Sequence, residues 1–183
     1  VVMKRHLLVL SILMLVAALP VAAMGINSSI RVGYGEVVDG DLATVNGRIQ
    51  IEDQATVNGD AESVNGEIEV GRDVQVDGGV AAVNGGVEIG EGTIVDGEVE
   101  TVNGPISMDL GSRAEAVGTV NGSVDLTGVE IDKDVSTYNG EVKLRQGTTV
   151  GGDIRILESK GNSNSGHNRA LRIYIEDGST VQG

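Results

Sequence analysis

The sequence predicts an all-β protein built as a single-stranded parallel β-helix (a solenoid) with about 18–19 residues per coil. The sequence numbers of successive asparagines differ by 19, 19, 19, 19, 18 and 18. Apolar residues keep the same period, and no segment after residue 23 shows a sustained helical period. Such self-similarity is typical of a solenoid, in which each repeat contacts only its neighbours. The asparagine column comprises Asn27, Asn46, Asn65, Asn84, Asn103, Asn121 and Asn139.

The composition narrows the possible functions. The chain of 183 residues contains 28 glycines and no cysteine, tryptophan or phenylalanine, and its formal net charge is −14. The lack of cysteine excludes a disulfide framework and a thiolate metal site. The acidic groups are spread along the chain, which argues against nucleic acid and anionic membranes as partners because both repel negative charge.

Residues 1–23 have the pattern of a secretory signal peptide. A basic start precedes an apolar run over residues 7–19, and a small-residue cleavage site ends at Ala23. We expect cleavage after Ala23 and export to the periplasm, the cell envelope or the outside of the cell. The alternative is an uncleaved membrane anchor, but Pro20 interrupts the run, which is short for a bilayer span of about 20 residues.

Residues 24–183 form the predicted β-helix domain. After each asparagine come two apolar positions with a mostly polar residue between them, which indicates a strand with one face in and one face out. A third apolar column precedes each asparagine and includes Leu42, Val80 and Val99. The first column is Ile30, Ile49, Ile68, Val87, Ile106, Val124 and Val142, and the second is Val32, Ile51, Val70, Ile89, Met108, Leu126 and Leu144.

Alternatives remain for the path of the chain. Asn-Gly between apolar residues also favours two-residue hairpins, but a meander of hairpins need not keep one fixed repeat length. Coils of this length are similar to those of the left-handed hexapeptide helix, yet most lack a six-residue period, which favours a right-handed coil. A polar insertion over residues 159–170 is expected to leave the coil as a surface loop. The last coil, which ends at Gly183, is predicted to be incomplete.

Three columns near the Asn-Gly corner are candidate functional features. The asparagines are expected to bond amide to amide and fix the turn, rather than form a row that binds a ligand. A mainly threonine column includes Ser63 and Ala82, and these two members disfavour a water-ordering, ice-binding row. A stripe beside it is either an exposed association surface or, if the chain bends near Thr44, part of the core. The stripe comprises Val45, Val64, Val83, Val102, Val120 and Tyr138.

No catalytic, cofactor-binding or metal-binding residue is predicted. His6 lies in the signal peptide and His167 in the insertion, and the common hydrolase, zinc and phosphate-loop motifs do not occur. Acidic pairs such as Asp39 with Asp41, and Asp132 with Asp134, lack the pattern of a calcium loop, which favours a solvated acidic surface. We therefore expect a protein that is not an enzyme and needs no cofactor.

The recurrent Thr-Val-Asn-Gly, followed by Ile-x-Ile or Val-x-Leu, carries a family resemblance. It occurs at residues 44–51 and 119–126, at 101–108 with methionine as the last residue, and at 137–144 with tyrosine in place of valine. This motif resembles bacterial β-strand-repeat proteins classed as adhesins, and the polymer-forming bactofilins. The likeness covers residues 25–183 and implies a right-handed β-helix that, in bactofilins, stacks end to end into filaments. The export signal and the interrupted coil depart from the bactofilin pattern.

The expected function is a non-catalytic, self-associating scaffold of the bacterial cell envelope, because uncapped strand edges attract further strands. The alternative is an adhesin-like module that binds a glycan or a protein partner on a lateral face. Outward residues such as Glu69 and Glu88 would form that face.

Overall fold

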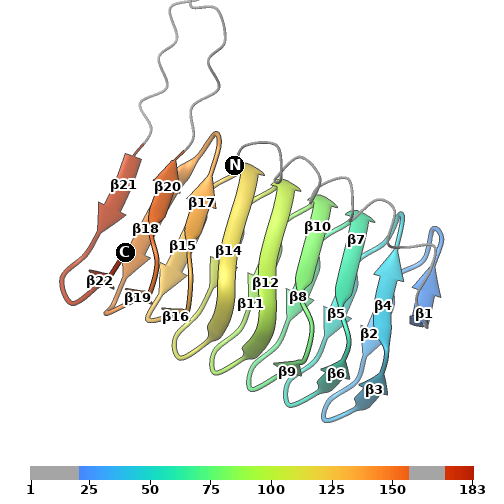
Figure 1. The fold of residues 1–183 in the computed structure, drawn as a ribbon. Helices are drawn as coiled ribbons and strands as arrows, with labels where there is room; N and C mark the ends of the chain where they lie inside the picture. Colours follow the sequence, from blue (N-terminus) through green and yellow to red (C-terminus); the bar gives the residue numbers. More distant parts are fainter. Residues whose placement is uncertain (1–20, 157–171) are drawn as a thin grey trace, which may run out of the picture.

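The computed structural model describes residues 21–156 and 172–183, and within them every element is a β-strand. The chain winds into about seven coils that stack along one axis, from β1 at one end to β22 at the other (Figure 1). All strand pairs are parallel. The predicted parallel β-helix is therefore confirmed, and the hairpin meander is wrong.

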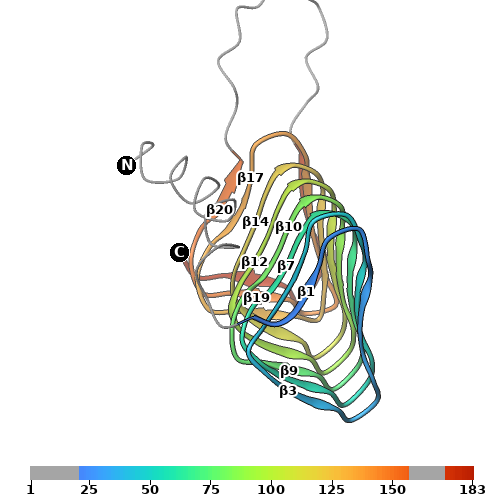
Figure 2. The same cartoon turned by 90° about the vertical axis from the view of Figure 1, so that its right-hand side faces the viewer.

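Each coil contributes to three rows of strands, which form the sides of the stack when it is viewed from its first coil (Figure 2). The first row is β1 (Val21–Gly25), β4 (Asp41–Thr44), β7 (Ala61–Asn65), β10 (Val80–Asn84), β12 (Ile94–Asn103), β14 (Arg113–Asn121), β17 (Val135–Thr137) and β20 (Ile154–Ile156). The second row is β2 (Ile30–Val32), β5 (Ile49–Ile51), β8 (Ile68–Val70), β11 (Val87–Ile89), β13 (Ile106–Met108), β15 (Val124–Thr127), β18 (Glu141–Arg145) and β21 (Arg172–Ile175). The third row is β3 (Val37–Asp39), β6 (Thr56–Asn58), β9 (Gln75–Val76), β16 (Glu130–Ile131), β19 (Thr149–Val150) and β22 (Thr180–Val181), together with the first residues of β12 and β14.

The strand register follows the sequence period. Val87 of β11 pairs with Ile68 on one side and Ile106 on the other, which are its counterparts one repeat earlier and one repeat later. The first shortened repeat is absorbed in β12, where the register with β14 shifts between Val95 and Glu98. Each inward column therefore lies directly above its counterparts.

The core is a narrow aliphatic column enclosed by the three rows. Ile49, Ile68 and Ile106 are fully buried, and so are Val57 and Val76 of the third row. Because the coil is narrow, small β-branched and aliphatic side chains fill it without aromatic residues, which agrees with the composition.

Two sequence predictions fall largely outside the described residues. The polar insertion 159–170 lies wholly outside them, and β21 after it pairs with β18 before it, with Arg172 opposite Glu141. Residues 1–20 of the predicted signal peptide also lie outside. Residues 21–25 form β1, so the predicted cleavage after Ala23 falls within a strand that pairs with β4.

Candidate functional site

The asparagine column forms a continuous hydrogen-bonded ladder along one corner of the stack. Each Nδ2 donates to the Oδ1 of the asparagine one coil earlier, over distances of 2.6 to 2.9 Å, in six successive bonds from Asn46 to Asn139. All seven side chains are exposed. Each amide inside the ladder donates through Nδ2 to the asparagine before it and accepts through Oδ1 from the asparagine after it. The geometry is therefore that of a turn-fixing ladder rather than a row of free amides.

The threonine-rich column faces the interior. Thr44, Ser63, Thr101, Thr119 and Thr137 are all buried. Four of the five hydroxyls donate to the carbonyl of the glycine in the previous Asn-Gly corner, over 2.9 to 3.2 Å, and the Thr44 hydroxyl donates to the Ser28 carbonyl. An inward row cannot order water at the surface, so the ice-binding alternative is wrong.

Ala82 is the member of this column without a hydroxyl, and replacing it should stabilise the protein. Ser63 and Thr101 flank it in register. Ala82→Ser would place a hydroxyl where it can donate to the Gly66 carbonyl. Ser63 and Thr101 donate in the same way to the carbonyls of Gly47 and Gly85. A net gain of about 0.5–1.5 kcal/mol is expected in urea unfolding. Ala81→Ser, which alters the neighbouring outward position in the same strand, is the control and should leave the midpoint unchanged. Equal effects of the two substitutions would contradict the assigned hydrogen bond.

The valine stripe lies on the outer side of the same corner. Val45, Val64, Val83, Val102, Val120 and Tyr138 are all half-buried, and none belongs to the buried core. In β7 and β10 the alternation of buried and half-buried residues continues up to the asparagine, so the stripe turns outward instead of inward. The stripe lies beside the asparagine ladder and offers a narrow apolar band rather than a broad patch.

The acidic pairs considered as cation ligands are occupied by donors of the protein. Asp39 Oδ1 accepts a hydrogen bond from Asn58 Nδ2 at 2.5 Å, and Asp41 Oδ1 accepts one from the backbone N–H of Asp60 at 2.9 Å. Arg113 binds both oxygens of Asp132. These carboxylates tie one coil to the next.

Glu62 is the carboxyl group with the most altered acidity among the described residues. Burial, together with the charges of Asp60 and Asp41, raises the pKa of Glu62 to about 7. Its position between Ala43 and Ala81 in register leaves it half-buried beside two other carboxylates. The fold therefore favours its neutral form.

The raised pKa predicts a pH-dependent stability. Because the folded pKa of Glu62 exceeds the unfolded value of 4.5, its contribution is most favourable below pH 4.5 and is lost as the pH rises to about 7. Glu62→Gln should therefore stabilise the protein at pH 8 by about 1 kcal/mol after allowance for solvent screening, with a smaller gain at pH 5. Thermal unfolding at both pH values measures this difference. Glu88→Gln, at an exposed position, is the charge-matched control, and a pH-independent effect of Glu62→Gln would refute the assignment.

A shallow trough hollows the outer face of the second row. It has a volume of about 580 Å³ and is lined by residues of five successive coils, including Tyr34, Glu69, Glu88 and Asp109. Glu69 and Glu88, singled out from the sequence as outward residues, are neighbours in register within it. Carboxylate oxygens of Glu67, Glu69 and Glu88 lie within 4.8 Å of one another, although Arg48 pairs with Glu67 and Glu69.

Comparisons with known proteins give no assignment: no family model, no curated protein and no solved structure matches the chain. Within residues 21–156 and 172–183, no helix is long and apolar enough to cross a membrane.

Proposed function

We propose that this protein is a non-catalytic structural component of the bacterial cell envelope that self-associates through its β-helix. The observation that supports the proposal is that a coil buries its inward columns only where a second coil covers them. Ile173, Ile175 and Val181, which no described coil covers, are 45%, 52% and 39% exposed, whereas their counterparts in the preceding coil are fully buried. Exposed apolar residues on an unpaired strand favour pairing with another strand.

The same columns run through the whole stack, so the first coil of a second molecule has side chains of the right kind to continue them. Ile173 stands in the column that begins with Ile30, and Ile175 in the column that begins with Val32. Contact of this kind would bury the exposed isoleucines under matching aliphatic residues and add parallel backbone hydrogen bonds.

Electron microscopy and sedimentation velocity of the purified protein test this proposal, with rods or filaments as the expected result. Ile173→Lys/Ile175→Lys should shift the population toward monomers, because charges would replace the exposed apolar side chains. Tyr174→Lys, at the outward position of the same strand, is the matched control and should still associate. A strictly monomeric wild-type protein at high concentration would refute self-association.

A second candidate function is an adhesin-like module that uses a lateral face. The trough that contains Glu69 and Glu88 favours it, because concave surfaces with convergent polar groups are common ligand sites. Loss of ligand binding on substitution of these residues, with unchanged assembly, would support this candidate over the first.

A further inference from the structure

Two glycines line the middle of the trough. Gly71 and Gly90 follow strands β8 and β11 and occupy a column in which the flanking coils carry Glu52 and Asp109. These two coils place no side chain between the two carboxylates, and a Cβ at either glycine would meet the backbone of the preceding coil. The trough therefore runs along the stack axis, from the coil of Glu52 to the coil of Asp109.

The charge of the trough is negative and only partly compensated. Arg31 pairs with Glu52, Arg72 with Asp53 and Arg48 with Glu69. Among the described residues, no cation lies within ion-pair distance of Glu88 or Asp109, and both side chains are exposed. The half of the trough that is distant from Tyr34 thus carries two uncompensated carboxylates.

Tyr34 forms an aromatic wall at the first coil. Its side chain is 67% exposed, yet it is held at two points. The backbone N–H donates to Glu52 Oε2 at 2.9 Å, and the hydroxyl donates to Gln54 Oε1 at 2.6 Å. The turn that projects the ring depends on Gly35, which has a φ of +65°. An exposed ring that is already ordered loses little entropy when a ligand stacks on it.

We propose that this trough binds an extended basic peptide segment whose lysine or arginine side chains lie along the stack axis. One cation would lie between Glu88 and Asp109, where charge-assisted hydrogen bonds are available, and another against the ring of Tyr34 as a cation–π contact. Stacked coils repeat every ~4.8 Å, so the two positions are about 14–19 Å apart. That span equals roughly four to six residues of extended chain.

A basic peptide fits this chemistry better than a neutral glycan, which would leave the charges of Glu88 and Asp109 uncompensated. The inference rests on the second candidate function, because it names a ligand for the lateral face, and it requires no contact between copies. Self-association and trough binding can therefore fail independently in experiments.

The test is a titration of the full protein, at 50 mM salt, with an acetylated peptide that has three lysines separated by Gly-Ser-Gly. Affinity is measured by fluorescence anisotropy and the position of binding by amide NMR. The wild-type protein should bind, with shifts at Gly71 and Gly90. Glu88→Gln/Asp109→Asn should weaken binding about fivefold or more. Tyr34→Ala should weaken it roughly two- to fivefold.

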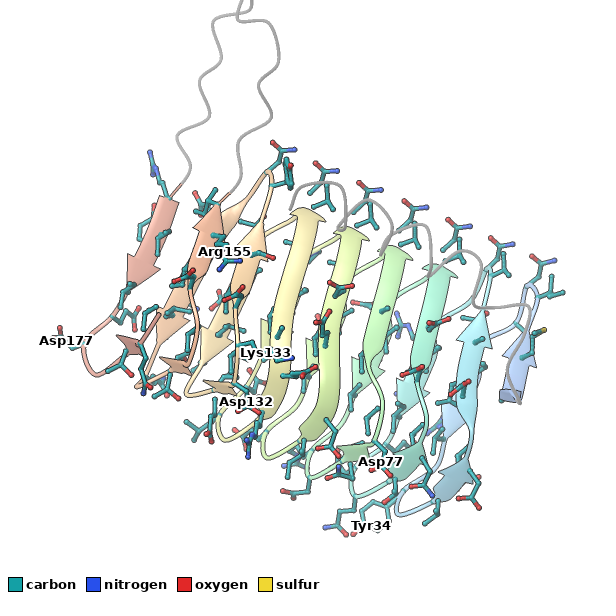
Figure 3. All side chains as sticks on the ribbon, in the orientation of Figure 1. Tyr34, Asp77, Asp132, Lys133, Arg155 and Asp177 are labelled. Atoms are coloured by element: carbon teal, nitrogen blue, oxygen red, sulfur yellow. The ribbon has the colours of Figure 1, made fainter. Side chains whose placement is uncertain are left out.

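The matched control is Glu176→Gln/Asp177→Asn, which removes the same charge from exposed positions three coils beyond Asp109. Asp177 and Tyr34 lie at opposite ends of the stack (Figure 3). This variant should change the affinity less than about twofold. Equal losses in both double variants, or no shifts at Gly71 and Gly90, would overturn the proposal. It would also be overturned if Ca²⁺ alone produced the same shifts while the peptide did not bind. Unchanged filaments together with absent peptide binding would reject this inference and leave self-association intact.

Discussion

Gly66→Ala should destabilise the protein by about 3 kcal/mol or more, because the new Cβ has no room. At each Asn-Gly corner from Gly66 onward the Cα of glycine sits against the backbone carbonyl of the glycine one coil earlier, and a Cβ at Gly66 would overlap the oxygen of Gly47. That oxygen accepts the buried hydroxyl of Ser63 and cannot move without breaking this bond. The obstacle is backbone rather than a flexible side chain, so relief requires separating two coils.

The matched control is Gly118→Ala, in a first-row column where other coils carry alanine, glutamate or serine. A Cβ there meets nothing closer than Ser136 Oγ at 3.3 Å, so the substitution should be neutral or should stabilise by about 0.4–1 kcal/mol. Urea unfolding followed by circular dichroism gives both values. Hydrogen exchange adds a spatial readout, because coils contact only their neighbours and protection should fall first in the coils beside residue 66. Equal midpoints for the two variants would contradict the close-approach explanation.

The same corner explains why the sequence signal for a hairpin was misleading. A type I′ hairpin turn needs positive φ at both central residues, which is why Asn-Gly favours it. From Asn46 onward, neither residue of any Asn-Gly pair has a positive φ within the described coils. Glycine is required there by the approach of the neighbouring coil, and asparagine by the ladder. Both requirements recur once per coil, so the period identified the parallel stack although the dipeptide alone suggested an antiparallel turn.

The inward columns were predictable because stacking gives every member the same environment. Ile49, Ile68 and Ile106 are equally buried for this reason. The residues of the corner that face inward were harder to predict, since the strand alternation before each asparagine could continue or break. In β7 it continues, so Ser63 is buried and Val64 turns outward. In the sequence, the threonine and serine residues of this column resemble surface residues. A residue pattern does not show the backbone carbonyls at the Asn-Gly corners that accept their hydrogen bonds.

The sequence also contains a periodic column of turn residues. Gly35, Gln54, Asp73, Gly92 and Gly111 stand at the same place in five successive repeats, and all five have positive φ. They form the turn between the second and third rows. Gln54 and Asp73 obscured the column because only glycine adopts this conformation at no steric cost. The trough was equally hidden, since its lining comes from five coils and no single motif in the sequence brings these residues together.

Leu126→Ala should lower the free energy of unfolding by about 2–5 kcal/mol, through lost apolar contact and the cavity left behind. Leu126 is fully buried in β15, in register between Met108 and Leu144. Backbone hydrogen bonds to the strands on both sides fix the spacing of the coils, so the walls cannot collapse into the space, and the cost should lie in the upper half of this range.

Leu110→Ala is the matched control, because the same atoms are removed from a side chain that is 51% exposed. It should change stability by less than about 0.5 kcal/mol. Urea unfolding of both variants, monitored by circular dichroism, gives the comparison. A fall in the midpoint with an unchanged slope for Leu126→Ala indicates lost packing in an intact stack, whereas a reduced slope indicates that the coils on either side of residue 126 unfold separately. Similar midpoints for the two leucine variants would contradict the conclusion that the aliphatic column inside the coils stabilises the fold.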